Sequence, residues 1–156
     1  MAASLRQQIV SAIITQMKTI STVNGYNSNL GTNVFDWKTS AWEAQEMPGI
    51  SVEDGLEITT PYTLGNPANT QGTCWNELKI ELRIAIQSGT TSAAVLRECI
   101  ADVVKAIGTN FTFGLQNTYT LQDKTESLLI QDKNVLGGAR VGFTIKYLSK
   151  YFSPYQ

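Results

Sequence analysis

The most constraining feature of this 156-residue chain is a strict alternation of apolar and polar side chains from Asn76 to Gln87. The apolar positions are Leu78, Ile80, Leu82, Ile84 and Ile86. The positions between them are mostly charged: Glu77, Lys79, Glu81, Arg83, Ala85 and Gln87. Successive side chains of a strand point to opposite faces, so this pattern predicts a β-strand with one dry and one wet face. We interpret the alternating charges as a solvated face rather than as a charged binding surface.

Two amphipathic helices are predicted to form a second layer. In residues 3–20 the apolar side chains recur at helical spacing: Leu5, Ile9, Ile13, Met17 and Ile20. Residues 91–107 contain a second apolar stripe: Ala93, Leu96, Ile100, Val103, Val104 and Ile107. We expect Gly108 to cap the end of this second helix. Asp102 lies off the apolar stripe, and we expect it to be exposed.

Shorter patterns predict the remaining strands, at residues 33–37, 50–53, 56–59, 127–131 and 139–147. Asp54-Gly55 is typical of a tight hairpin turn, so residues 56–59 are predicted to run back along residues 50–53. Residues 60–73 are rich in proline, glycine and asparagine and are predicted to form a long loop. Residues 109–125 show no pattern that assigns them. The order of elements predicts one α+β domain over residues 1–156, a small, mainly antiparallel or mixed sheet packed against two amphipathic helices.

Composition excludes some partners. The net charge is −1, from 12 basic and 13 acidic residues, and no basic cluster is present. Tight nucleic-acid binding needs several phosphate contacts from Lys and Arg, so we expect no direct nucleic-acid binding. No stretch of 18 apolar residues and no signal peptide are present, so we expect no membrane association and an intracellular origin. In that compartment Cys74 and Cys99 are expected to be free thiols.

The sequence offers little for catalysis. It contains no histidine, which excludes Ser-His-Asp and Cys-His arrangements and histidine-containing zinc sites. The common phosphate-binding glycine motifs are also missing. Glu53 and Asp54 are adjacent on a predicted strand and should point to opposite faces, so they are not expected to form an acid/base pair. Cys99 is expected to be a buried, unreactive thiol. We therefore expect a protein that is not an enzyme, with no catalytic residue, metal or cofactor.

Aromatic side chains are candidates for contacts with other proteins. Trp37, Trp42 and Trp75 are most simply explained by core packing, with an interface role as the alternative. Loops and termini are poor places to bury large apolar side chains within one domain. We therefore predict an interface from the long loop, the unassigned segment and the tail, with these candidate residues: Pro61, Tyr62, Leu64, Phe111, Phe113, Tyr151, Phe152 and Tyr155.

Several segments, read in order, resemble the tail terminator proteins of long-tailed bacteriophages. They are the segment Gly-Tyr-Asn-Ser-Asn-Leu-Gly-Thr-Asn-Val-Phe at 25–35, Met-Pro-Gly-Ile-Ser-Val-Glu-Asp-Gly-Leu-Glu at 47–57, the alternating strand 76–87 with the helix carrying 101–108, and the closing strand 142–147. The chain departs from the family's pattern at 36–38, where a short basic stretch would be expected. The resemblance covers most of the chain.

The resemblance implies a structural role in the virion. Such proteins form a ring, usually a hexamer, on the head-proximal end of the tail tube, where the ring stops tube growth and offers a surface for head joining. The implied partners are further copies of the chain, the tail tube protein and the head–tail connector protein. DNA would pass through the ring without specific binding, and assembly would take place in the bacterial cytoplasm. The alternatives are another neck component, such as a head–tail joining or tail completion protein, and a small ligand-binding domain or enzyme.

Overall fold

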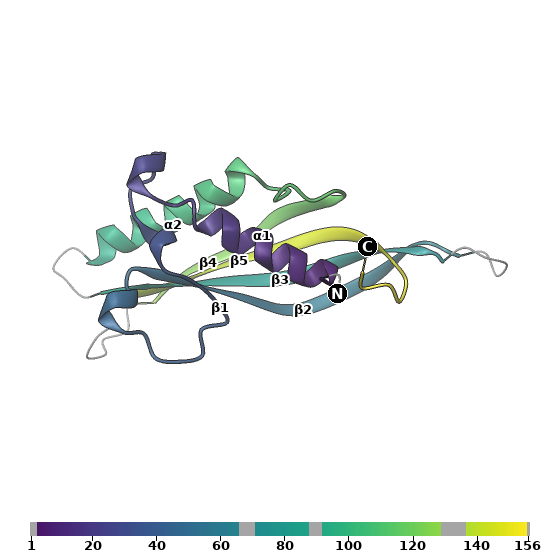
Figure 1. The fold of residues 1–156 in the computed structure, drawn as a ribbon, viewed down its shortest axis with the longest axis horizontal. Helices are drawn as coiled ribbons and strands as arrows, with labels where there is room; N and C mark the ends of the chain where they lie inside the picture. Colours follow the sequence, from purple (N-terminus) through teal and green to yellow (C-terminus); the bar gives the residue numbers. More distant parts are fainter. Residues whose placement is uncertain (1–2, 66–70, 88–91, 129–136, 156) are drawn as a thin grey trace.

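The computed structural model describes residues 3–65, 71–87, 92–128 and 137–155. These residues form a five-stranded mixed sheet with the order β1-β2-β3-β5-β4 and two helices, which confirms the predicted α+β class (Figure 1). The elements are α1 (Leu5–Met17), β1 (Val34–Asp36), β2 (Gly49–Thr63), β3 (Thr73–Ile86), α2 (Ser92–Thr109), β4 (Thr118–Leu128) and β5 (Gly137–Lys150). Three short 3-10 helices lie before and after β1, at Thr22–Asn24, Leu30–Thr32 and Ala44–Glu46. Strand β1 is parallel to β2, and the other pairs are antiparallel.

Strands β3 and β5 form the centre of the sheet. They pair without a register shift from Thr73 opposite Lys150 to Ile86 opposite Gly137. Both strands alternate, so the pairing places most of their apolar side chains on one face. The buried members include Leu78, Ile80, Leu82, Ile84, Val141, Phe143 and Ile145. This face is the floor of the hydrophobic core.

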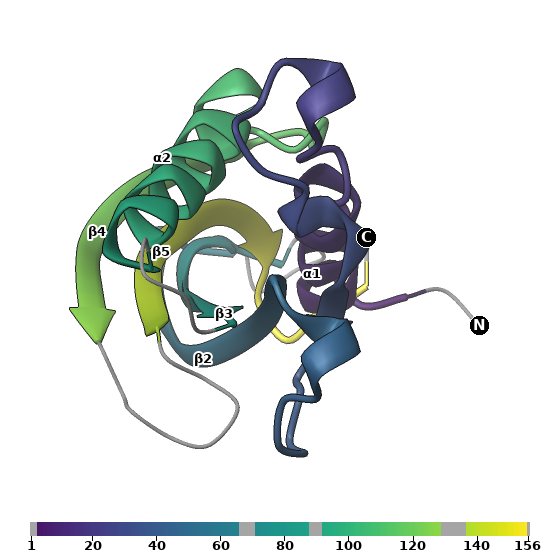
Figure 2. The ribbon, with the colours of Figure 1, turned by 90° about the vertical axis from the view of Figure 1, so that its left-hand side faces the viewer.

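Helices α1 and α2 cover that face. Helix α1 packs against β1 and β2, α2 packs against β3 and β5, and the two helices contact each other. Figure 2, which views the molecule from one end, shows the helices beside the twisted sheet. Their buried apolar side chains are Ile9, Val10, Ile13, Met17, Leu96, Cys99, Val103, Ala106 and Ile107. Burial of each large aliphatic side chain contributes roughly 1.5–3 kcal/mol, so the contact between this layer and the sheet is a main source of stability.

The predicted turn at Asp54-Gly55 is wrong. Strand β2 continues through it to Thr63, with a register shift in which Gly55 and Leu56 lie opposite the single residue Lys79. Such a bulge inserts a residue and bends the strand without reversing it. The predicted loop 60–73 is consequently shorter than expected, and Pro61 lies within β2, on a stretch of the strand that β1 does not reach.

Three boundaries also differ from the predictions. Strand β4 begins at Thr118, inside the segment that could not be assigned, and the rest of the predicted strand 127–131 lies outside the described residues. Helix α2 extends to Thr109, so Gly108 is helical rather than a cap. Helix α1 ends at Met17, although the stripe continues into the buried Ile20.

Asp102 was expected to be exposed, and this prediction is wrong: the residue is only 1% exposed. The segment after α1 folds over α2 and donates four hydrogen bonds to the carboxylate. Asn27 donates from its backbone N–H (3.1 Å) and Nδ2 (3.3 Å), and Ser28 from its backbone N–H (2.8 Å) and Oγ (2.7 Å). A buried carboxylate is tolerated only when hydrogen-bonded in this way, so Asp102 anchors this segment to α2.

We expect Asp102→Asn to lower the free energy of unfolding by about 2–3 kcal/mol, because the amide cannot accept all four hydrogen bonds and loses the charge that strengthens them. Urea unfolding followed by circular dichroism measures this change. The control is Glu98→Gln, an exposed position on the same helix, for which we expect a change within about 0.5 kcal/mol. Equal effects of the two substitutions would show that Asp102 has no anchoring role.

Candidate interaction surfaces

The face of the sheet opposite the helices has a charged region in which basic and acidic side chains are paired. The ion pairs are Lys146–Glu77 (2.5 Å), Lys79–Asp123 (2.7 Å), Arg140–Glu81 (3.6 Å) and Arg83–Glu53. Each exposed pair stabilises the fold by at most about 1 kcal/mol. Their larger effect is to make this outer face nearly neutral, so a partner that covers it need not desolvate unpaired charges.

Next to the ion pairs lies a set of three aromatic side chains from three strands, which we call the aromatic row: Tyr62, Trp75 and Tyr119. The ring centroids of Tyr62 and Trp75 are 5.9 Å apart, as are those of Trp75 and Tyr119, and both pairs are edge-to-face. Tyr62 is 61% exposed and Tyr119 is 37% exposed. Strand register places two more exposed side chains, Ile58 and Leu121, on the same face. Ile58 lies opposite Glu77. Leu121 lies opposite Thr144, and Thr144 lies opposite Lys79.

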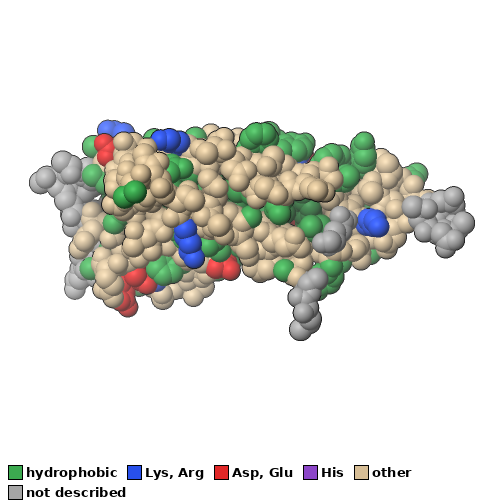
Figure 3. Space-filling model, turned by 45° about the horizontal axis from the view of Figure 1, so that its top comes forward, with side chains coloured by type: hydrophobic (Ala, Val, Ile, Leu, Met, Phe, Trp, Pro, Cys, Tyr) green, Lys and Arg blue, Asp and Glu red, His purple; other side chains and the backbone are tan. Residues whose placement is uncertain are grey.

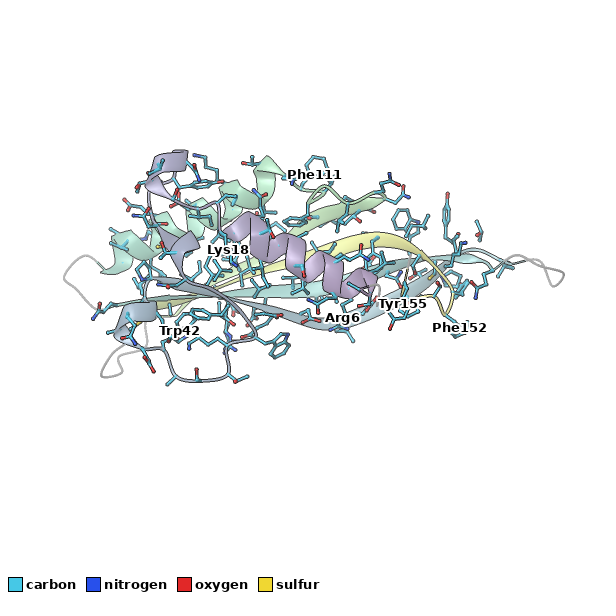
Figure 4. The ribbon with its side chains drawn as sticks, in the orientation of Figure 1. Arg6, Lys18, Trp42, Phe111, Phe152 and Tyr155 are labelled. Carbon is cyan, nitrogen blue, oxygen red and sulfur yellow. The ribbon has the colours of Figure 1, made fainter. Side chains whose placement is uncertain are left out.

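The C-terminal segment forms a second apolar surface, on the helix side of the sheet. The backbone N–H of Tyr151 donates to Gly72 O (3.0 Å), and that of Leu5 donates to Pro154 O (2.8 Å), so both ends of the segment are fixed. Phe152, between them, is 97% exposed, and Tyr155 is also exposed (Figure 4). We call Phe152 and Tyr155 the C-terminal knob.

A cavity of about 690 Å³ lies between the C-terminal segment, the start of α1 and the inner face of the sheet. Its floor includes Thr59, Asn76 and Ser149, whose polar groups bond to one another. Thr59 Oγ1 donates to Asn76 Oδ1 (2.9 Å), and Asn76 Nδ2 donates to Ser149 Oγ (2.7 Å). Every buried side-chain nitrogen and oxygen of the described residues has a hydrogen-bond partner. A ligand site normally presents converging polar groups, and these groups are already paired with each other.

The candidate interface residues divide into exposed and buried ones. Pro61, Tyr62, Leu64, Phe111, Phe152 and Tyr155 are exposed, and Tyr151 is half-buried. Phe113 is only 7% exposed and packs in the core, so its prediction as an interface residue is wrong. The turn after α2 directs its side chain inward, with the backbone of Phe113 at φ +51°.

Core packing was predicted for the three tryptophans, and this prediction is wrong. Trp37 is 49% exposed, and Trp42 and Trp75 are half-buried. Trp75 and Tyr119 belong to the aromatic row. An interface role for Trp75 was the alternative to core packing, whereas Tyr119 was not predicted as a surface residue. The sequence could have predicted the outward position of Trp75. This residue precedes Glu77 by two positions in the alternating strand and therefore lies on the charged face of β3.

Glu53 and Asp54 have different partners, and both cysteines are buried. Glu53 pairs with Arg83, whereas Asp54 accepts hydrogen bonds from Arg6 and Trp37, so the two carboxylates do not form an acid/base pair. Both cysteines are free thiols. Burial raises the pKa of the Cys99 thiol to about 11, and the nearby Asp102 adds to the effect, so this thiol is protonated and unreactive at neutral pH.

Charged side chains are dispersed on one face of the molecule (Figure 3). Figure 3, a space-filling view of one face, shows Lys, Arg, Asp and Glu side chains scattered rather than clustered. Within the described part of the chain, no three His, Cys, Asp or Glu side chains are grouped so as to hold a metal ion. No described helix is long and apolar enough to cross a membrane.

Comparison with protein-family models and with curated protein sequences gave no match to the chain.

The pKa of Asp54 predicts a pH dependence of stability. Partial burial alone would raise this pKa, but the hydrogen bonds from Trp37 and Arg6 outweigh burial and hold it below the usual value of 3.8. When the pKa of a carboxyl is lower in the folded state than in the unfolded state, its ionisation stabilises the fold. This stabilisation is complete above the pKa of the unfolded state and is lost as pH falls through the pKa of the folded state. We therefore expect the Asp54→Asn variant to lose less of its free energy of unfolding than the wild type as pH falls from about 5 to about 2.

Urea unfolding at a series of pH values measures this slope. Asp36→Asn, at an exposed position of β1, is the matched control and should leave the slope close to that of the wild type. An Asp54→Asn slope equal to that of the wild type would contradict the ionised, hydrogen-bonded role of Asp54.

Proposed function

We propose that this chain is a structural subunit of a bacteriophage tail, a tail terminator that assembles into a ring at the head-proximal end of the tail tube. The ring would end tube polymerisation and present a surface to the head–tail connector. The observation that carries the proposal is the division of exposed aromatic side chains between two different surfaces of one small domain. A head-to-tail ring requires two different contact patches on each subunit, whereas a symmetric dimer uses one patch twice.

The open edges of the sheet also support self-assembly. In the described part of the chain, β1 pairs only with Ile50–Val52, which leaves the rest of β2 unpaired on that side. At the opposite edge β4 pairs only with β5. Exposed strand edges are templates for pairing with another chain, and here they differ in sequence and lie on opposite sides of the sheet. Such an arrangement suits an interface between unlike surfaces of identical subunits.

The chemistry of the surface fits a protein that DNA passes without being held. The chain has a net charge of −1, and the charges of the outer face are neutralised in pairs. Binding to duplex DNA scales with the number of phosphates that Lys and Arg contact, so a lumen without a basic cluster would let DNA slide. The paired polar groups in the cavity beside the C-terminal segment support a structural role over a catalytic one.

A tube-capping experiment tests the proposal. The cognate tail tube protein is polymerised with and without the purified chain, and tube lengths and ends are recorded by negative-stain electron microscopy. We expect shorter tubes with a ring-shaped density at one end, because a cap binds the growing end and offers no equivalent end itself. Binding to the isolated head–tail connector with no effect on tubes would instead identify a joining protein, and binding to neither would contradict a role in the tail.

A further inference from the structure

Phe152 combines two unfavourable features. Its side chain is 97% exposed, and its backbone has φ +54°, a left-handed conformation that bulky residues rarely adopt. Hydrogen bonds on both sides fix the segment, from Tyr151 N–H to Gly72 O and from Leu5 N–H to Pro154 O. A strained, exposed aromatic residue held by its surroundings is typical of a contact residue rather than of a folding element.

The aromatic row is suited to receive such a side chain. Its three rings come from β2, β3 and β4 and are already packed edge-to-face, so little side-chain freedom is lost when a partner covers them. The adjacent charges of Lys146 and Glu77 satisfy each other at 2.5 Å. A neutral aromatic partner therefore fits this surface better than a charged one.

The knob and the row cannot contact each other within one copy. The knob follows β5 on the helix side of the sheet, where its segment borders the cavity with Asn76 and Ser149. The row lies on the opposite face, with Glu77 and Lys146. Both surfaces are aromatic and uncharged, and each copy carries one of each. The complement of each surface is therefore present on a second copy of the same chain.

On the basis of the proposed ring, we infer that neighbouring subunits join by seating the knob of one copy, Phe152 and Tyr155, on the aromatic row of the next, Tyr62, Trp75 and Tyr119. The contact is head-to-tail, so it leaves one knob and one row free in any open chain of subunits and none in a closed ring. Buried aromatic side chains dominate the energetics of protein interfaces, so this contact would be the main determinant of subunit affinity.

Cysteine cross-linking between two single variants tests the inference in the full-length chain. Ser153→Cys, next to the knob, and an affinity-tagged Thr60→Cys, at an exposed position opposite Trp75, leave the side chains of both surfaces intact. The two variants are mixed under conditions in which the wild type assembles, oxidised with copper phenanthroline, and separated on a non-reducing gel. A disulfide between position 153 and position 60 then joins two copies. The native Cys74 and Cys99 are buried and should contribute little. We expect a tagged–untagged dimer as the main product, and little product when either variant is oxidised alone.

The matched control replaces Ser153→Cys by Val23→Cys, at a position 93% exposed but outside both surfaces. It should give at least tenfold less mixed dimer. Assembly without a 153–60 cross-link above this control, or dimers from one variant alone, would overturn the inference and leave the proposed function standing. Failure of the wild type to assemble, both alone and on tube ends, would overturn the proposed function and this inference together. Phe152→Ala, checked for folding by circular dichroism, should weaken assembly at least tenfold.

Discussion

The pairing of β3 with β5 determines where the other elements of the fold can lie. The two strands stay in register over their whole length, and each alternates between apolar and polar side chains. A slip of one residue would move every apolar side chain of one strand to the wrong face, so the register is strongly specified. With the register fixed, one face of the sheet must be covered by α1 and α2. The other face carries paired charges beside the aromatic row, and the C-terminal segment that follows β5 presents the knob on the helix side.

Much of this architecture could be predicted from the sequence because it depends on local periodicity. The alternation from Asn76 to Gln87 and the helical stripes around Ile13 and Val103 identified the central strand and both helices. The α+β class followed from their order. Periodicity failed where structure depends on partners distant in the chain. Asp54-Gly55 has the sequence of a tight turn, but β3 offers a continuous partner beyond it, and a bulge at Gly55 lets β2 continue.

The same limit applies to the candidate surfaces. Phe113 and Phe111 are two residues apart in an unassigned segment, and the turn that buries one and exposes the other has no sequence signature. The exposure of Asp102 was predicted from its position on the helix alone. The residue is buried because the segment that carries Asn27 and Ser28, distant in sequence, covers it. Tyr62, Trp75 and Tyr119 lie together only because three strands bring them together. Tyr62 was predicted as a contact residue, Trp75 only as the alternative to core packing, and Tyr119 not at all. The exposed position of Phe152 was predicted, because a tail of this composition has nowhere internal to bury it.

A closed ring requires that this domain associates with itself through two unlike surfaces and that the association closes. Light scattering coupled to size-exclusion chromatography measures this association, on the chain alone over a concentration series and on the chain released from tube ends. We expect a mass that rises to a fixed multiple of the monomer and stays there at higher concentration, since a closed ring leaves no free surface. A mass that keeps rising would show that the contacts do not close. A monomeric mass in both preparations would contradict self-assembly altogether.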